Sequence, residues 1–364
     1  MDYFTELKRD NRWIHERLNE EIDKQFESSV LPVHESLSED RDILKDYLAK
    51  PGRGIGGSLV LRLAGLKHPG FDYDAALRVA AATELQNAGI LIIDDWMDDS
   101  QFRKGQPTVH ERYREIEFHR DVADARAVQL GMLAMTIATN IVSDGEYPGQ
   151  LAVIRTMHHA NQRIIAGTIL ENKLPNRRDL QTRESVRSVY KSKTGEYSFG
   201  APIKSGLALA GVDNPVTLDM FNDFSSNLGL GFQIDDDTMG IYGKPEETGK
   251  PNTDDMRHGV YTLLYDAAKG GRRLKELYGK RDLSEDEAVE CRELIRKSSE
   301  KNLAVMALQG HRWKYYDNAA SALYRRAWNE EWNPATREYL QSMVSFLKNK
   351  PIPALWSPPT NCRT

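Results

Sequence analysis

The stretch "LIIDDWMDDSQFRKGQPTVH", residues 91–110, places four aspartates directly after a run of aliphatic residues. Asp94 and Asp98 are four residues apart, as are Asp95 and Asp99, so on a helix each pair shares one face. Like charges at this spacing destabilise a helix by roughly a few tenths of a kcal/mol. Mg²⁺ bound between the carboxylates would remove this repulsion. In proteins, Mg²⁺ is commonly shared with substrate phosphates. The stretch therefore favours a magnesium site at the end of a buried helix, with a solvated acidic turn as the alternative.

A second acidic cluster argues against interpreting the first one as a solvated turn. Asp235, Asp236 and Asp237 again follow an apolar segment, and Lys250 comes shortly after them. Two clusters that each close a hydrophobic helix, and that are each followed by cations, are hard to explain as solvated surface. Carboxylates with bound metals, together with lysines and arginines, would neutralise a diphosphate and make it a leaving group. The pattern indicates a site for a diphosphate that carries a hydrophobic tail.

Helical periodicity predicts the fold. Apolar residues recur at three- and four-residue spacing in 73–93, 125–142, 151–170 and 215–237, whereas alternating strand-type runs are scarce. The first two segments are apolar on nearly all sides, which is typical of helices that are surrounded by others. We expect an all-α protein with one domain over residues 1–364, a helical bundle around a deep apolar cavity that accepts the tail.

Composition limits the class of protein. Of 364 residues, 40% are hydrophobic and 28% are charged, as in ordinary globular proteins, and the net charge of -5 argues against a nucleic-acid partner. The two cysteines lack metal-ligand spacing. The charged N-terminal segment has no apolar core like that of a secretory signal, and no apolar run reaches the length of a membrane span. We expect no membrane span and a cytoplasmic location.

These motifs carry a family resemblance. Residues 91–110 resemble the first aspartate-rich motif of the trans-isoprenyl diphosphate synthases, the polyprenyl synthetase family that makes farnesyl and geranylgeranyl diphosphates. "KSKTGEYSF" (191–199) resembles the family's Lys-Thr-Gly segment, and "FQIDDDTMGIYGKPEETGKPNTDDMRHGVYTLL" (232–264) resembles its second aspartate-rich motif. The resemblance implies the isoprenoid synthase class I fold, a homodimer, and three Mg²⁺ ions shared with the substrate diphosphate.

The resemblance also assigns roles to residues. It implies five metal ligands, which are Asp94, Asp95, Asp98, Asp236 and Asp237. These aspartates and Lys193 form the implied catalytic set. The implied substrate-binding residues are Arg53, Asn87, Arg103, Lys104, Thr194, Gln233 and Lys250. Arg103 would contact the allylic diphosphate.

Several positions depart from the family pattern. In "KPGRGIGGSLVLR" (50–62), Arg53 takes the place of a lysine, while Gly54 and Gly56 stand where arginines are usual. Asn87 occupies a position that is usually His or Gln, and Lys104 occupies one that is usually Arg. An ammonium does not reproduce the paired contacts of a guanidinium, so the site for isopentenyl diphosphate has fewer strong contacts. In the second motif, Gly240 replaces the last aspartate.

Three functions follow from this balance. A condensing enzyme would ionise an allylic diphosphate and join it head to tail with isopentenyl diphosphate. A class I terpene synthase would ionise the same substrate but capture the cation within the same molecule, releasing a hydrocarbon or alcohol. A regulatory subunit is the third possibility, although such subunits tend to lose the first-motif aspartates that this chain retains. We favour the condensing enzyme, and the weakened isopentenyl diphosphate site keeps the terpene synthase open.

Two residues upstream of the first motif predict product length. In the family, bulky aromatic residues at the fourth and fifth positions before the motif block chain growth near about fifteen carbons. Here these positions hold Ile90 and Gly89. We predict that the cavity floor is open at both and that the product has about twenty carbons or more. Gly89→Phe would then shorten the product.

Overall fold

The fold comes from a computed structural model, which describes residues 3–49, 54–67, 70–244, 252–268, 271–301, 303–324, 328–329 and 332–350. Its α-helices are α1 (Tyr3–Gln25), α2 (Ser38–Ala49), α3 (Ile55–Ala64), α4 (Tyr73–Met97), α5 (Val109–Ile116), α6 (Arg120–Ser143), α7 (Gln150–Lys173), α8 (Arg183–Ser192), α9 (Ala201–Leu209), α10 (Pro215–Tyr242), α12 (Asp254–His258), α13 (Leu263–Ala268), α14 (Arg272–Leu277), α15 (Glu285–Lys301), α16 (Leu303–Ala322) and α17 (Pro334–Asn349).

Short elements connect the helices. They are the π-type turns η1 (Phe26–Val30) and η5 (Glu196–Gly200), the 3₁₀ turns η2 (Glu35–Leu37), η3 (Leu174–Asn176) and η4 (Arg178–Leu180), and the strands β1 (Phe102–Arg103) and β2 (Gln106–Pro107). The two strands form a small antiparallel hairpin directly after the first aspartate cluster. The all-α prediction is confirmed.

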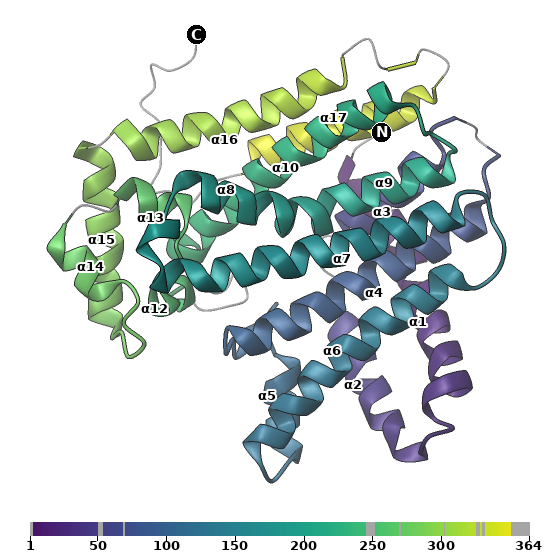
Figure 1. Cartoon of the computed structure of the whole chain (residues 1–364), viewed down its shortest axis with the longest axis horizontal. Coiled ribbons are helices and arrows are strands. Elements are labelled where there is room, and N and C mark those ends of the chain that lie inside the picture. The colour runs from purple at the N-terminus through teal and green to yellow at the C-terminus, as the bar shows by residue number, and fades with distance from the viewer. Residues whose placement is uncertain are drawn as a thin grey trace.

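The long apolar helices lie beside one another in the fold. Figure 1 shows α7 and α9 side by side along the long axis of the molecule, with α4 and α6 on one side and α10, α16 and α17 on the other. The apolar α4 begins behind an N-cap, where the Asp72 side chain accepts a hydrogen bond from the Ala75 backbone N–H. Both α4 and α6 are long and apolar enough to cross a membrane by length and composition, yet here they pack against each other.

The crossing of α4 and α6 depends on two glycines. A Cβ placed at Gly89 would lie 2.6 Å from the Gly131 carbonyl oxygen and 2.8 Å from Met135 Cγ. A Cβ at Gly131 would in turn lie 2.9 Å from the Gly89 carbonyl oxygen. The two backbones therefore touch at this point, which only glycine allows. Gly89 faces α6 and is not among the residues that line the cavity described below.

We therefore expect Gly89→Ala to lower the free energy of unfolding by about 2 kcal/mol, because the added methyl group meets backbone atoms that cannot rotate away. Chemical denaturation would measure the change. Gly271→Ala is the control, since a Cβ at Gly271 meets no atom of the described residues within 4 Å. An unchanged stability in Gly89→Ala would show that the two helices do not approach this closely.

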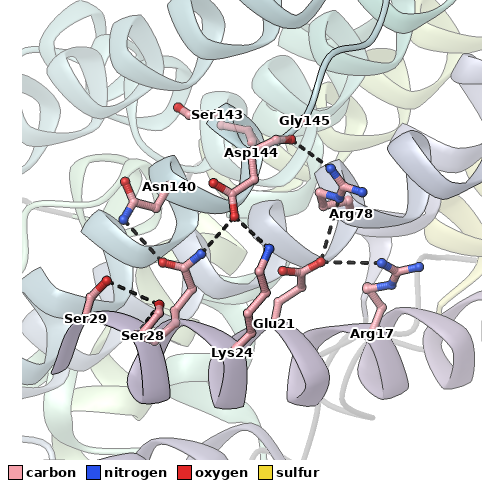
Figure 2. A network of polar contacts seen from close by, with 12 residues as sticks. Arg17, Glu21, Lys24, Ser28, Ser29, Arg78, Asn140, Ser143, Asp144 and Gly145 are labelled. Atoms are coloured by element: carbon pink, nitrogen blue, oxygen red, sulfur yellow. Dashed lines mark hydrogen bonds and ion pairs between the residues drawn. The ribbon is translucent and has the colours of Figure 1, made fainter. Parts of the chain in front are cut away.

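A network of charged and polar side chains holds α1 against α4 and the loop after α6. Figure 2 shows Glu21 of α1 paired with Arg17 on the same helix and with Arg78 of α4, and Lys24 of α1 paired with Asp144. Lys24 Nζ lies 2.9 Å from Asp144 Oδ2, and Arg78 donates at 2.7 Å to the Asp144 carbonyl oxygen. Because α1 is tied at this end, its opposite face is held in a defined position over the interior.

Candidate active site

The first aspartate cluster lies in the last turn of α4, and its members have different partners. Asp95 is 1% exposed, and Arg103 donates through Nε to both of its carboxylate oxygens at 2.8 and 2.7 Å. The hairpin makes this contact possible, because Lys104 (φ 54°) and Gly105 (φ 73°) adopt left-handed backbone conformations that turn the chain back. Asp95 is therefore engaged with Arg103 below the surface.

Asp94 pairs with a partly buried lysine, whose charge is also influenced by Asp98. Lys193, at the end of α8, places Nζ 2.8 Å from Asp94 Oδ1 and 2.7 Å from Glu171 Oε2. Burial would lower the pKa of Lys193, but the negative charges of Asp94, Glu171 and Asp98 outweigh it and hold that pKa well above its usual value. Lys193 is therefore a fixed cation beside two aspartates of the first motif.

The three aspartates of the second cluster, on α10, point in different directions. Asp235 is buried and accepts hydrogen bonds from Arg312 and, at 2.9 Å, from the Tyr316 hydroxyl. Asp237 is also buried and accepts hydrogen bonds from the Tyr190 hydroxyl and from Gln233. Asp236 alone of the three lines the cavity described below.

Asp237 belongs to a chain of buried hydrogen bonds. The Thr194 hydroxyl donates to Gln233 Oε1, and Gln233 Nε2 donates to Asp237 Oδ1 at 2.8 Å. Burial raises the pKa of Asp237 to about 8, despite the hydrogen bonds from Tyr190 and Gln233. Thr194 and Gln233 thus link the end of α8 to α10 and orient Asp237, and neither is among the residues that line the cavity.

Asp255, a residue that the sequence reading missed, lies beside Gly240. A Cβ at Gly240 would overlap the Asp255 carboxylate, which comes from α12. Gly240 stands where the family's second motif has its last aspartate. The space beside it therefore holds a carboxylate from another part of the chain. The adjacent pair "DD" at 254–255 was the available signal, but its distance in sequence from Gly240 gave no reason to place it there.

A cavity of about 600 Å³ lies between α1, α2, α3, α4, η5 and α10. Its apolar wall includes Ile14, Leu18, Leu48, Ile55, Ala88, Leu91, Phe232 and Met239. Its polar and charged lining includes Asn11, His15, Tyr47, Glu84, Asn87, Arg103, Lys104, Tyr197, Asp236 and Lys350. Burial and the negative charges of Asp236 and Asp94 raise the pKa of Tyr197. Arg103, which also lines the cavity, binds Asp95 of the first cluster. The predicted apolar cavity is therefore present, with aspartates of two helices near it.

The remaining predicted substrate-binding residues divide into three groups. Asn87, Arg103 and Lys104 line the cavity, and the Asn87 amide donates to the Tyr197 carbonyl oxygen at 3.4 Å. Ile90 packs with Ala160, Ile164, Ala201 and Tyr197 in a separate small cluster. Arg53 and Lys250 lie outside the described residues.

Four further residues that line the cavity were not predicted from the sequence. Glu84 is partly buried and accepts a hydrogen bond from the Gly57 backbone N–H at 2.7 Å, and desolvation raises the pKa of its carboxyl group. The Tyr47 hydroxyl is buried and makes no hydrogen bond within the described chain. Asn11 and His15 enter the cavity from α1, about eighty residues before the first motif. No local pattern marks them, because they reach the site only through tertiary packing.

A different group of possible metal ligands combines one exposed, one partly buried and one fully buried side chain. Oxygen and nitrogen atoms of Asp99, His110 and Glu111 lie within 4.8 Å of one another. Arg114 forms ion pairs with both Asp99, at 3.2 Å, and Glu111, and therefore already neutralises this group. The second aspartate pair of the opening motif is thus divided, with Asp95 bound by Arg103 inside and Asp99 paired with arginines outside.

Comparison with known proteins identifies the family. A family model described as polyprenyl synthetase matches residues 40–295. The chain belongs to the polyprenyl synthetase family. It is an enzyme of the trans-prenyltransferase class. The (2E,6E)-farnesyl diphosphate synthase of Mycobacterium bovis is 30% identical over 253 residues, which cover 67% of each chain. The geranylgeranyl diphosphate synthase of Saccharolobus solfataricus is 28% identical over 242 residues, covering 63% of this chain and 69% of that protein.

Solved structures agree on the fold. The geranylgeranyl pyrophosphate synthase from Corynebacterium glutamicum, complexed with isoprenyl diphosphate and magnesium, superposes with a TM-score of 0.84 at 22% identity. The match covers 95% of this chain and 99% of that one. The all-α isoprenoid synthase fold expected from the motifs is therefore confirmed.

Proposed function

We propose that this member of the polyprenyl synthetase family ionises an allylic isoprenyl diphosphate and condenses it head to tail with isopentenyl diphosphate. The observation that carries the proposal is one cavity lined by Asp236 of α10 and by Arg103, which binds Asp95 of the first motif. In the same turn of α4, Asp94 pairs with the ammonium group of Lys193, so carboxylates of both motifs and fixed cations are available to a metal-bound diphosphate. The apolar wall beside them supports binding of the tail and keeps water away from a carbocation.

The metal set that we propose is the five aspartates of the two motifs, with three Mg²⁺ ions. Asp94, Asp98 and Asp236 offer hard carboxylate oxygens of the kind Mg²⁺ prefers, so the donor chemistry fits. Asp95 and Asp237 are held in this structure by Arg103 and by Tyr190 with Gln233. Bound Mg²⁺ would neutralise the diphosphate and stabilise it as a leaving group.

The chain's own residues account for the rest of the reaction. Lys193 supplies a fixed positive charge as the carbon–oxygen bond of the allylic substrate breaks and its electron pair leaves with the diphosphate. The double bond of isopentenyl diphosphate then attacks the allylic carbon, forming the new carbon–carbon bond. A proton leaves the resulting cation to a base, for which the released diphosphate is available. Leu91 and Phe232 line the cavity and shield the cation from water.

Lys104 gives the second substrate site a pH dependence. Burial, reinforced by the charge of Arg103, lowers the pKa of Lys104 to about 8. The side chain is therefore an ammonium group below that pH and a neutral amine above it. We expect kcat/KM for isopentenyl diphosphate to fall up to about tenfold between pH 7 and pH 9, because kcat/KM reports the ionisation of the free enzyme.

Lys104→Arg is the control for that profile, since a guanidinium stays charged over the whole range. Its kcat/KM for isopentenyl diphosphate should not show the fall. If the wild-type and Lys104→Arg profiles coincide, Lys104 does not control binding of the second substrate.

Product length of about twenty carbons or more also remains a prediction. Gly89 contacts α6, whereas Ile90 packs in the same small cluster as Tyr197, which lines the cavity, so Ile90 is the better position for testing the cavity floor. We expect Ile90→Phe to shorten the longest product by at least one five-carbon unit, measured by chromatography of the dephosphorylated products. An unchanged product distribution would place the floor elsewhere.

We further propose a homodimer. Exposed apolar side chains on α6 and α7 support it, because Met132, Leu151, Ile165 and Ile169 are all more than half exposed. A cytoplasmic location stays a prediction from composition.

Product analysis tests the proposed function. Purified protein would be incubated with Mg²⁺ and geranyl, farnesyl or geranylgeranyl diphosphate, each with and without isopentenyl diphosphate. We expect longer diphosphates only when isopentenyl diphosphate is present. Hydrocarbons or alcohols formed from an allylic substrate alone would overturn the proposal in favour of a terpene synthase.

A further inference from the structure

Side chains longer than that of glycine at positions 54 and 56 would meet residues of α1 and α4 in this fold. At Gly54 the backbone has φ 62°, and a Cβ there would overlap the Asn11 side chain of α1. At Gly56 a Cβ would lie 3.3 Å from Glu84 Oε1 and 3.4 Å from Asn87 Nδ2. The space that longer side chains would need is therefore occupied by α1 and α4.

The α1 helix presents one face to the cavity beside these glycines. Asn11, Ile14, His15 and Leu18 all line the cavity, and their spacing of three and four residues places them on one side of the helix. Ile14 and Leu18 are buried in the core, whereas Asn11 and His15 are only partly buried. Of the two polar members, Asn11 is the one that meets Gly54, and His15 follows it by one helical turn.

His15 has no competing partner in the described chain. Its backbone carbonyl accepts a hydrogen bond from Asn19, but within the described residues its imidazole ring has no hydrogen bond or ion pair. It shares the cavity with Lys104 and Asn87, two residues that the family resemblance assigns to isopentenyl diphosphate. An imidazole is a hydrogen-bond donor at neutral pH and a cation when protonated, and both forms bind phosphate oxygens.

We propose that His15 binds the diphosphate of isopentenyl diphosphate and compensates for the arginines absent at positions 54 and 56. This inference rests on the proposed function, because it requires a second diphosphate in the cavity. The ion pairs and hydrogen bonds of α1 with Arg78 and Asp144 hold His15 in position (Figure 2). His15 is a substrate-binding residue in this scheme, and it takes no part in bond breaking.

Steady-state kinetics of three variants test the proposal. For His15→Ala we expect KM for isopentenyl diphosphate to rise about tenfold, as for loss of a hydrogen bond to a charged group. KM for the allylic diphosphate and kcat should stay within about twofold. His15→Arg should return KM for isopentenyl diphosphate toward the wild-type value. His159→Ala is the matched control, since His159 is exposed on α7 and is not among the cavity-lining residues, and it should change neither KM.

Each other result overturns the inference in a distinguishable way. If the wild type elongates its substrate and His15→Ala leaves KM for isopentenyl diphosphate unchanged, only the role of His15 is wrong. If both KM values of His15→Ala rise together and His15→Arg does not correct them, the residue acts through packing of α1. If the wild type forms no product that depends on isopentenyl diphosphate, the proposed function fails and this inference fails with it. Thermal unfolding of each variant verifies that the compared proteins are folded.

Discussion

Replacing Asp236 by asparagine is expected to lower kcat about a thousandfold while leaving the thermal unfolding midpoint within about 2 °C of the wild type. Of the three consecutive aspartates on α10, Asp236 alone lines the cavity. We propose that its carboxylate binds the metal-bound diphosphate from that helix. Asparagine keeps the shape of the side chain but removes its charge, so the loss should appear in catalysis and not in folding.

Turnover with saturating Mg²⁺ and both substrates would measure this loss. Raising the Mg²⁺ concentration should recover only part of it, because the missing ligand also orients the diphosphate. A variant that keeps more than about a tenth of the wild-type kcat would contradict the assignment of Asp236 to the diphosphate site.

Replacing the neighbouring Asp235 by asparagine should have the opposite effect, a loss of stability with little loss of activity. Asp235 pairs with the buried Arg312 and accepts a hydrogen bond from Tyr316, so the substitution leaves a buried guanidinium without its counter-charge. Breaking one side of a buried ion pair costs about 3 kcal/mol. We expect the free energy of unfolding to fall by that amount, as measured by urea denaturation, while kcat per folded molecule changes little.

The pair of variants separates two explanations of the second motif. If Asp235→Asn lost its activity with unchanged stability, then Asp235 would face the substrate and the observed contact with Arg312 would be wrong. If both variants lost activity and stability together, the end of α10 would act as one structural unit. The structure predicts loss of activity at Asp236 and loss of stability at Asp235.

The sequence predicted the helices because their apolar spacing is a local property. Segments 73–93, 125–142, 151–170 and 215–237 correspond to α4, α6, α7 and α10. The two acidic clusters were also recognisable, since each follows directly on an apolar helix. The two clusters themselves predicted a shared diphosphate site, and in the structure Asp236 and Arg103, the partner of Asp95, line one cavity.

The direction of individual side chains was not predictable in the same way. Successive residues on a helix point about 100° apart, so the three adjacent aspartates on α10 must face three surroundings. Periodicity could not say which one faces the cavity, because α10 is buried on several sides. Only the positions of Arg312 and Tyr190, which come from other helices, separate Asp235 and Asp237 from Asp236.

Two other features depend on contacts between distant segments. Gly89 was expected to leave the cavity floor open, but it instead allows the backbones of α4 and α6 to touch at Gly131. The approach of α1, which brings Asn11 and His15 to the cavity, depends on charged residues spread over three segments. A sequence pattern shows which face of a helix is apolar, but it does not show which helix lies against that face.

The most direct test is whether one chain binds both diphosphates at once. Isothermal titration calorimetry with Mg²⁺ would first saturate the protein with a thiolo analogue of farnesyl diphosphate, which resists ionisation, and then add isopentenyl diphosphate. We predict that isopentenyl diphosphate binds to this complex with one site per chain, and that Asp236→Asn weakens binding of the analogue. Failure of isopentenyl diphosphate to bind, or displacement of the analogue by it, would contradict a cavity that holds two substrates for condensation.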